Sequence, residues 1–139
     1  MTNIALKQAQ TVKPQILICD DDLEYAQELI EALGTRGFAA KNLLTITQAR
    51  ASLLLPSILL LDLCMPQRSA IDIAKILAEH PRKSCFKIVL ISGCSEVVIQ
   101  SVSRQFEMRG LDLLGCFQKP VDVRKLCELL KIATDSASR

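Results

Sequence analysis

The amino-acid sequence predicts one α/β domain, built on a doubly wound, five-stranded parallel sheet. Short apolar segments of strand length alternate along the chain with longer segments whose apolar residues recur at helical spacing. Three of the short segments, "ILIC", "ILLL" and "KIVLI", are almost continuously hydrophobic, which is typical of central strands covered by helices on both faces. Strands and helices that alternate in this way build a parallel sheet between two helical layers. The length of 139 residues suits one such domain.

The folded domain is expected to span residues 15–134. Residues 1–14 are polar, lack periodicity and end in a proline, so they predict a flexible leader. This leader has no apolar stretch of the kind found in signal peptides. Residues 135–139 are polar and predict a frayed tail.

Five segments have the length and apolar character of strands. The second is the least apolar, which suits an edge of the sheet. In chain order they are "QILICD" (15–20), "FAAKNLL" (38–44), "SILLLD" (57–62), "FKIVLIS" (86–92) and "LLGCFQ" (113–118).

Five segments between and after these strands have helical periodicity. They are "DLEYAQELIEALGTRG" (22–37), "TITQARASLLL" (45–55), "AIDIAKILAEH" (70–80), "SEVVIQSVSRQFEMRG" (95–110) and "DVRKLCELLKIA" (122–133). The expected N-caps are Asp22, Thr45 or Thr47, Ser95 and Asp122. The expected stops are Gly34 or Gly37, Pro56 and Gly110. The first helix gathers an apolar face from Tyr25, Ala26, Leu29, Ile30 and Leu33, and the third offers Ile71, Ala74, Ile76 and Leu77 for burial.

Composition argues against several classes of function. The net charge is only +2 and aromatic residues make up 4% of the chain, so a nucleic-acid surface is not expected. The longest apolar runs are strand-sized, so no membrane span is expected. The cysteines are scattered singly and there is one histidine, which excludes the paired spacing of a structural zinc site. We interpret them as reduced thiols of a cytoplasmic protein: Cys19, Cys64, Cys85, Cys94, Cys116 and Cys127.

Polar residues stand at the carboxyl ends of four of the five predicted strands. In an open α/β sheet these ends meet at one edge, where ligands bind. The residues expected there are Asp20 and Asp21 after the first strand, Asp62 at the end of the third, Ser92 at the end of the fourth, and Lys119 with Pro120 after the fifth.

Three carboxylates at one edge need a compensating charge. Two carboxylates about 4 Å apart repel by roughly 4 kcal/mol at an effective dielectric constant of 20. One lysine offsets part of this repulsion, and a hard divalent cation with oxygen ligands, for which Mg²⁺ is the best fit, offsets the rest. A carboxylate beside such a cation, with an ammonium and a hydroxyl opposite, can accept a phosphoryl group.

The motifs "ILICDDD", "ILLLDLCMP", "VLIS" and "FQKP", in this order, resemble the receiver domain of two-component response regulators. The resemblance covers residues 15–133. It implies a flavodoxin-like (βα)5 receiver fold with strand order 2-1-3-4-5. It also implies a signalling switch in a phosphorelay, in which a sensor histidine kinase or a phosphotransfer protein phosphorylates Asp62.

The resemblance also implies a role for each residue at the edge. Asp21 would bind Mg²⁺ directly and Asp20 through water, together with Asp62 and the backbone carbonyl of Cys64. Ser92 and Lys119 would contact the phosphoryl group. The Lys119–Pro120 peptide bond would be cis, a form that only X–Pro bonds adopt at a modest free-energy cost relative to trans.

Two positions depart from the family's usual residues. Ala70 stands where many receivers have glycine, so the turn must avoid a positive φ at Ala70 or be slightly strained. Cys116 stands at the switch position, three residues before Lys119, where the family usually has Tyr or Phe. Phe117, on the other face of the strand, is not expected to substitute for that aromatic residue.

The resemblance implies output through the fourth helix, fifth strand and fifth helix, to a downstream domain or protein, and it is compatible with a homodimer. The domain would be a switch with slow self-dephosphorylation and not an enzyme. A degenerate receiver that serves as a constitutive protein-binding module is the alternative, with Cys116 in its favour. A haloacid-dehalogenase-like phosphatase is disfavoured, because Cys64 replaces the second aspartate that such enzymes use.

Overall fold

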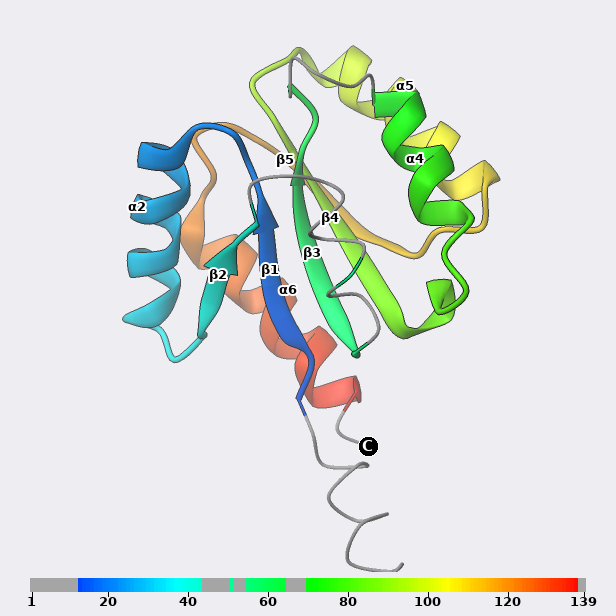
Figure 1. Cartoon of the computed structure of the whole chain (residues 1–139). Coiled ribbons are helices and arrows are strands. Elements are labelled where there is room, and N and C mark those ends of the chain that lie inside the picture. Colours follow the sequence, from blue (N-terminus) through cyan, green and yellow to red (C-terminus); the bar gives the residue numbers. More distant parts are fainter. Residues whose placement is uncertain (1–12, 44–50, 52–54, 65–69, 138–139) are drawn as a thin grey trace, which may run out of the picture.

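The structure is a computed structural model that describes residues 13–43, 51, 55–64 and 70–137. Within these residues a five-stranded parallel sheet has the order β2-β1-β3-β4-β5, which confirms the predicted fold class and strand order (Figure 1). The strands are β1 (Gln15–Cys19), β2 (Ala40–Asn42), β3 (Ser57–Asp62), β4 (Phe86–Ser92) and β5 (Leu113–Gln118).

Helices cover both faces of this sheet. Helices α2 (Leu23–Gly34) and α6 (Val123–Ala137) pack on one face, and α4 (Ala70–Ala78) and α5 (Glu96–Met108) pack on the other (Figure 1). A short 3₁₀ helix, η1 (Lys83–Cys85), precedes β4. The predicted helix over residues 45–55, with Thr45 or Thr47 as its expected N-cap, lies almost wholly outside the described residues. Residues 1–12 of the predicted leader also lie outside them.

The core has two layers because side chains of a strand point alternately to the two faces of its sheet. In β1, Leu17 and Cys19 face α4 and α5, whereas Ile16 and Ile18 face α2 and α6. All six residues of β3 are buried. A strand covered on both sides therefore has to be apolar at consecutive positions, which is the pattern that "SILLL" shows.

The predicted N-caps of α2, α5 and α6 are confirmed. Asp22 accepts a hydrogen bond from the backbone N–H of Tyr25 at 3.1 Å, and Asp122 accepts one from Lys125 at 3.2 Å. Ser95 caps α5 in the same way through the N–H of Val98, at 3.5 Å. Each of these oxygens satisfies an N–H that has no partner within its helix.

Glycines end two of the helical segments in a backbone conformation that L-residues rarely adopt. Gly37 follows α2 with φ of 89°, and Gly110 follows α5 with φ of 78°. Gly34 is the last residue of α2. No described non-glycine residue has a positive φ, so Ala70 begins α4 without that strain.

Three expectations about the elements need correction. Ile71 is 45% exposed, and Ile73 is buried in its place. Successive helical residues are rotated by about 100°, so the face formed by Ile73, Ala74 and Leu77 leaves Ile71 on the opposite side. Strand β2 is shorter than expected, and α6 continues three residues into the predicted tail.

None of the helices in the described part of the chain combines the length and apolar character that a membrane span requires.

Candidate functional site

The carboxyl ends of β1 and β3 bring three carboxylates together. Asp20, Asp21 and Asp62 offer oxygen atoms that all lie within 4.8 Å of one another. The register pairs Cys19 with Leu61, so the residues that follow them emerge side by side at the same edge. Asp20 and Asp62 are each only 3% exposed, whereas Asp21 is exposed to solvent. The sequence prediction that these residues meet is confirmed.

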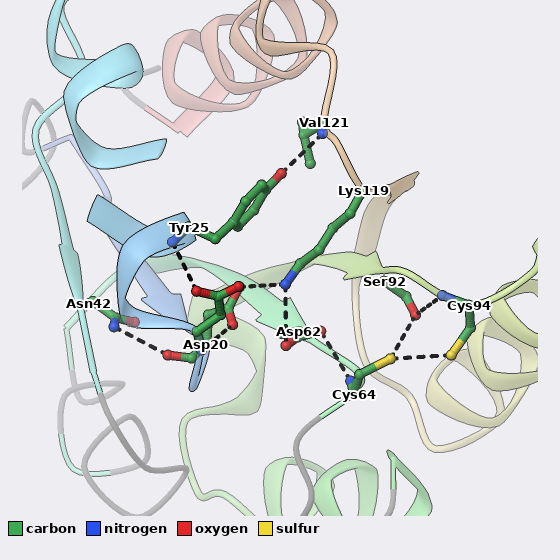
Figure 2. A network of polar contacts seen from close by, with 10 residues as sticks. Asp20, Tyr25, Asn42, Asp62, Cys64, Ser92, Cys94, Lys119 and Val121 are labelled. Atoms are coloured by element: carbon green, nitrogen blue, oxygen red, sulfur yellow. Dashed lines mark hydrogen bonds and ion pairs between the residues drawn. The ribbon is translucent and has the colours of Figure 1, made fainter. Parts of the chain in front are cut away.

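Neighbouring elements hold Asp20 from three directions (Figure 2). Its Oδ1 accepts a hydrogen bond from the N–H of Asp22 at 2.9 Å, and its backbone oxygen accepts one from the Asn42 side chain at 3.2 Å. Its Oδ2 accepts one from Nζ of Lys119, also at 2.9 Å. Sequence reasoning missed Asn42, although it stands at the carboxyl end of β2 and the argument used for the other strands would have found it.

Lys119 reaches over the edge from the end of β5. Its Nζ is 2.9 Å from Oδ2 of Asp20 and 3.5 Å from Oδ2 of Asp62. Burial alone would lower the pKa of Lys119, but the hydrogen bond to Asp20 and the charges of Asp62 and Asp20 outweigh it and raise the pKa. The bond from Lys119 to Pro120 is cis.

Tyr25, from α2, supports Lys119 and was not predicted to do so. The ammonium of Lys119 lies 4.5 Å from the centre of the Tyr25 ring, within reach of a cation–π interaction. The Tyr25 hydroxyl accepts a hydrogen bond from the N–H of Val121 at 3.0 Å. Figure 2 shows the ring beside the lysine, with its hydroxyl directed to the segment that follows β5. Tyr25 therefore joins the first helix to the lysine-bearing segment.

Asp62 carries a charge that its surroundings only partly compensate. Its Oδ1 accepts a hydrogen bond from the N–H of Cys64 at 3.0 Å. Burial and the charge of Asp20 raise the pKa of Asp62. The hydrogen bond from Cys64 and the charge of Lys119 lower it, but they do not outweigh the first two effects, so the pKa is raised overall. The ionised carboxylate is therefore less stable here than in water, and a cation beside it would offset this.

Ser92 is fully buried at the end of β4. Its hydroxyl oxygen accepts a hydrogen bond from the N–H of Cys94 at 2.9 Å and lies 3.4 Å from Sγ of Cys64. Hydrogen bonds from Ser92 and Cys64 lower the pKa of the Cys94 thiol. The contacts of Cys64 and Cys94 around Ser92 were not anticipated from the sequence, which placed only the backbone carbonyl of Cys64 at this site.

Cys116, at the predicted switch position, is exposed on β5. Its Sγ lies 2.9 Å from Oγ of Ser103 on α5. Phe117 is partly buried and packs against the core layer beneath α2 and α6. The structure therefore places the aromatic ring in the layer beneath α2 and α6, while Cys116 contacts α5.

The donor set at the edge fits a hard cation. Three carboxylates face one ammonium, so the group has an excess of negative charge. All the side-chain donors are carboxylate oxygens, which Mg²⁺ prefers, and the exposure of Asp21 leaves room for the water molecules that Mg²⁺ retains. Asp20, Asp21 and Asp62 are thus able to hold such an ion.

Comparisons with known proteins found similar chains among solved structures only. No family model matches the chain, and a search of curated proteins gave no match. Among solved structures, a response regulator from Colwellia psychrerythraea is 28% identical with a TM-score of 0.71, and the match covers 90% of this chain and 99% of that one. A response regulator receiver protein from Pseudomonas putida is 26% identical with a TM-score of 0.71, covering 87% and 98%. A sensor protein from Polaromonas sp. is 25% identical with a TM-score of 0.73, covering 91% and 99%.

The doubly wound sheet and the polar edge define a signalling domain of the receiver class. More specifically, the chain is a receiver domain of the response-regulator type used in two-component signalling, as its sequence motifs predicted.

Proposed function

We propose that this receiver domain, residues 15–134, is a switch that a histidine kinase phosphorylates on Asp62, directly or through a phosphotransfer protein, with Mg²⁺ bound. The observation that carries the proposal is the position of Asp62. It is buried at the end of β3, within 4.8 Å of two other carboxylates and 3.5 Å from the ammonium of Lys119. A carboxylate in these surroundings is suited to act as a nucleophile toward a phosphoryl group.

Four groups would hold the cation. They are the clustered carboxylates of Asp20, Asp21 and Asp62 and the backbone carbonyl of Cys64. The resemblance to receivers implies that Asp21 would bind the ion directly and Asp20 through water. When bound, Mg²⁺ would neutralise charge on the incoming phosphoryl oxygens.

The chain's own residues carry the transfer. One carboxylate oxygen of Asp62 forms a bond to phosphorus while the bond from phosphorus to the donor histidine nitrogen breaks. Lys119 then pairs with a phosphoryl oxygen, and its ion pairs with Asp20 and Asp62 support this role. The Ser92 hydroxyl, which lies on the neighbouring strand, donates a hydrogen bond to another phosphoryl oxygen. Slow hydrolysis of the aspartyl phosphate resets the switch, so the domain is a switch more than an enzyme.

A route from the site to the output surface supports the proposal. The N–H of Cys94 bonds to Ser92, and the carbonyl of Cys94 accepts a hydrogen bond from the Gln118 side chain at 2.9 Å. A displacement of Ser92 would therefore reach β5 without an aromatic switch residue. The output surface is then formed by α5, β5 and α6, where a downstream domain, a separate protein or a second copy of the chain would bind. We place this switch in the cytoplasm, with its kinase partner.

The alternative is a degenerate receiver that binds a partner constitutively. The exposed Cys116, which contacts Ser103 in place of the usual aromatic residue, favours it. The two functions differ in one respect: only the switch responds to phosphorylation at Asp62.

Beryllofluoride, an analogue of the phosphoryl group, separates them. We expect the wild-type domain, mixed with beryllofluoride and Mg²⁺, to change its amide NMR spectrum around Ser92 and along α5 and β5. Asp62→Asn should abolish the change. Asp112→Asn is the matched control, because Asp112 is an exposed aspartate paired with Lys87 and should leave the response intact. A wild-type spectrum that does not respond would refute the switch and favour the constitutive module.

A further inference from the structure

Two cysteine thiols lie against each other beside the phosphoacceptor. Cys64 and Cys94 follow β3 and β4, each two residues beyond the last residue of its strand. Their Sγ atoms are 3.2 Å apart, and Figure 2 shows the two side chains pointing toward each other. Cys64 is exposed and Cys94 is half-buried, so small molecules in solution can reach the pair.

The backbone brings the two thiols within reach of a covalent bond. The ladder between β3 and β4 pairs Asp62 with Ile91, and the N–H of Leu63 still bonds to the Ile91 carbonyl at 3.0 Å. Neighbouring strands are about 4.8 Å apart, and a disulfide spans Cα separations of about 4.4 to 6.8 Å. The sulfurs need to approach by only about 1 Å to reach the disulfide length of roughly 2.05 Å.

The thiol pair also touches the groups that would handle the phosphoryl group. The N–H of Cys64 bonds to Asp62, the N–H of Cys94 bonds to Ser92, and Sγ of Cys64 lies 3.4 Å from the Ser92 hydroxyl. A covalent link between the two cysteines would join the loops that orient the nucleophile and the hydroxyl. Neither would then adjust independently when a phosphoryl group arrives.

We propose that Cys64 and Cys94 form a reversible disulfide that slows phosphorylation of Asp62. The oxidant is a low-molecular-weight disulfide such as oxidised glutathione. One cysteine thiolate attacks a glutathione sulfur, releases one glutathione and forms a mixed disulfide; the other cysteine attacks the protein sulfur of this intermediate and releases the second. Two protein thiols are oxidised, one glutathione disulfide is reduced to two thiols, and both thiol hydrogens leave with the glutathiones.

The effect on phosphorylation rests on the proposed function, but formation of the bond does not. The first measurement is therefore chemical and uses the whole chain with oxidised glutathione. Formation of the bond should remove two hydrogen atoms from the intact mass, after subtraction of any glutathione bound to other cysteines. Trypsin should yield a linked pair of peptides, 51–68 and 88–104, each of which contains a single cysteine. Cys64→Ser and Cys94→Ser should each retain a bound glutathione and give no linked pair.

Cys116→Ser is the matched control, since Cys116 is exposed but contacts Ser103 instead of another thiol. This variant should form the linked peptides as the wild type does. A glutathione adduct on wild-type Cys64 or Cys94 without the linked pair would overturn the proposal.

The second measurement is the rate of Asp62 phosphorylation by acetyl phosphate with Mg²⁺. We expect the oxidised wild type to react about tenfold more slowly than the reduced protein, since a misplacement of reacting groups by about 1 Å can cost as much as about a hundredfold. Dithiothreitol should restore the rate, and oxidised glutathione should not slow Cys64→Ala in the same way. Equal rates for the linked and reduced forms would overturn the regulatory part. A reduced protein that never reacts, although the linked peptides form, would instead refute the proposed function.

Discussion

The ammonium group of Lys119 lies 2.9 Å from a carboxylate oxygen of Asp20, and this contact joins residues at the ends of β5 and β1. The same ammonium is 3.5 Å from Asp62. One lysine therefore partly neutralises two buried carboxylates. Under the proposed function a phosphoryl oxygen would pair with this ammonium, and a bound cation would compete with it for the carboxylates. We expect this residue to couple the stability of the free domain to its response to ligands.

Lys119→Met should lower the free energy of unfolding by about 2–3 kcal/mol in the absence of Mg²⁺, because two buried carboxylates lose their cation. The effect stays below that of a fully buried pair, since the Lys119 side chain is 20% exposed. Urea unfolding measures it. Lys87→Met is the control: its partner Asp112 is exposed, so its loss should change stability by about 0.5 kcal/mol or less. Equal losses in the two variants would contradict the coupling described for Lys119.

Asp62→Asn should stabilise the domain near neutral pH, and the gain should depend on pH. The pKa of Asp62 is raised above its ordinary value of 3.8 in the folded state. The folded protein therefore holds this proton more tightly than the unfolded chain, and Asp62 reduces stability progressively as the pH rises through its folded pKa. Below 3.8 the carboxyl is protonated in both states and the reduction disappears.

The measurement for this prediction is the difference in unfolding free energy between Asp62→Asn and the wild type, taken by urea titration at several pH values. The difference should increase in favour of the variant from acid to neutral pH, without Mg²⁺. A difference that does not vary with pH would show that Asp62 has the same pKa in both states.

Mg²⁺ should stabilise the folded wild-type domain, and Asp21→Asn should remove most of that gain. A ligand at one hundred times its dissociation constant adds about 2.7 kcal/mol to the free energy of unfolding. Asp21 is exposed, so its substitution alone should change stability by no more than about 0.5 kcal/mol. Thermal unfolding with and without Mg²⁺ measures both quantities. If Asp21→Asn keeps the full gain, the ion is not bound at this edge.

Gly110→Ala should destabilise the domain by about 1 kcal/mol, since alanine does not tolerate the positive φ at this position. The backbone has φ of 78°, and an added Cβ would lie 3.2 Å from Nζ of Lys83. Gly34→Ala is the matched control: it ends α2, nothing lies within 4 Å of its added Cβ, and its φ is not positive. That variant should be as stable as the wild type or more stable by about 0.5 kcal/mol. Urea unfolding of both variants tests the pair.

Most of the fold was predictable because it depends on patterns that are local in the chain. The runs "ILIC" and "ILLL" are apolar at consecutive positions, which only a doubly covered strand requires. Asp22, Ser95 and Asp122 stand directly before helical segments, and each forms the capping hydrogen bond that its position predicts. Which face of α4 would be buried was less certain, because its apolar residues surround the helix; contact with the sheet selects Ile73 and exposes Ile71.

The positions of polar residues along the chain were enough to predict which of them reach the edge of the sheet. A parallel sheet brings the carboxyl ends of all its strands to one edge. Asp20, Asp62, Ser92 and Lys119 could therefore be assigned there, because each ends a strand or directly follows one. The contacts that these residues make became visible only in the folded chain. Lys119 contacts the Tyr25 ring, and Cys64 contacts Cys94, although the partners in each pair are far apart in the chain. Such contacts depend on the register and packing of separate elements, which no local periodicity encodes.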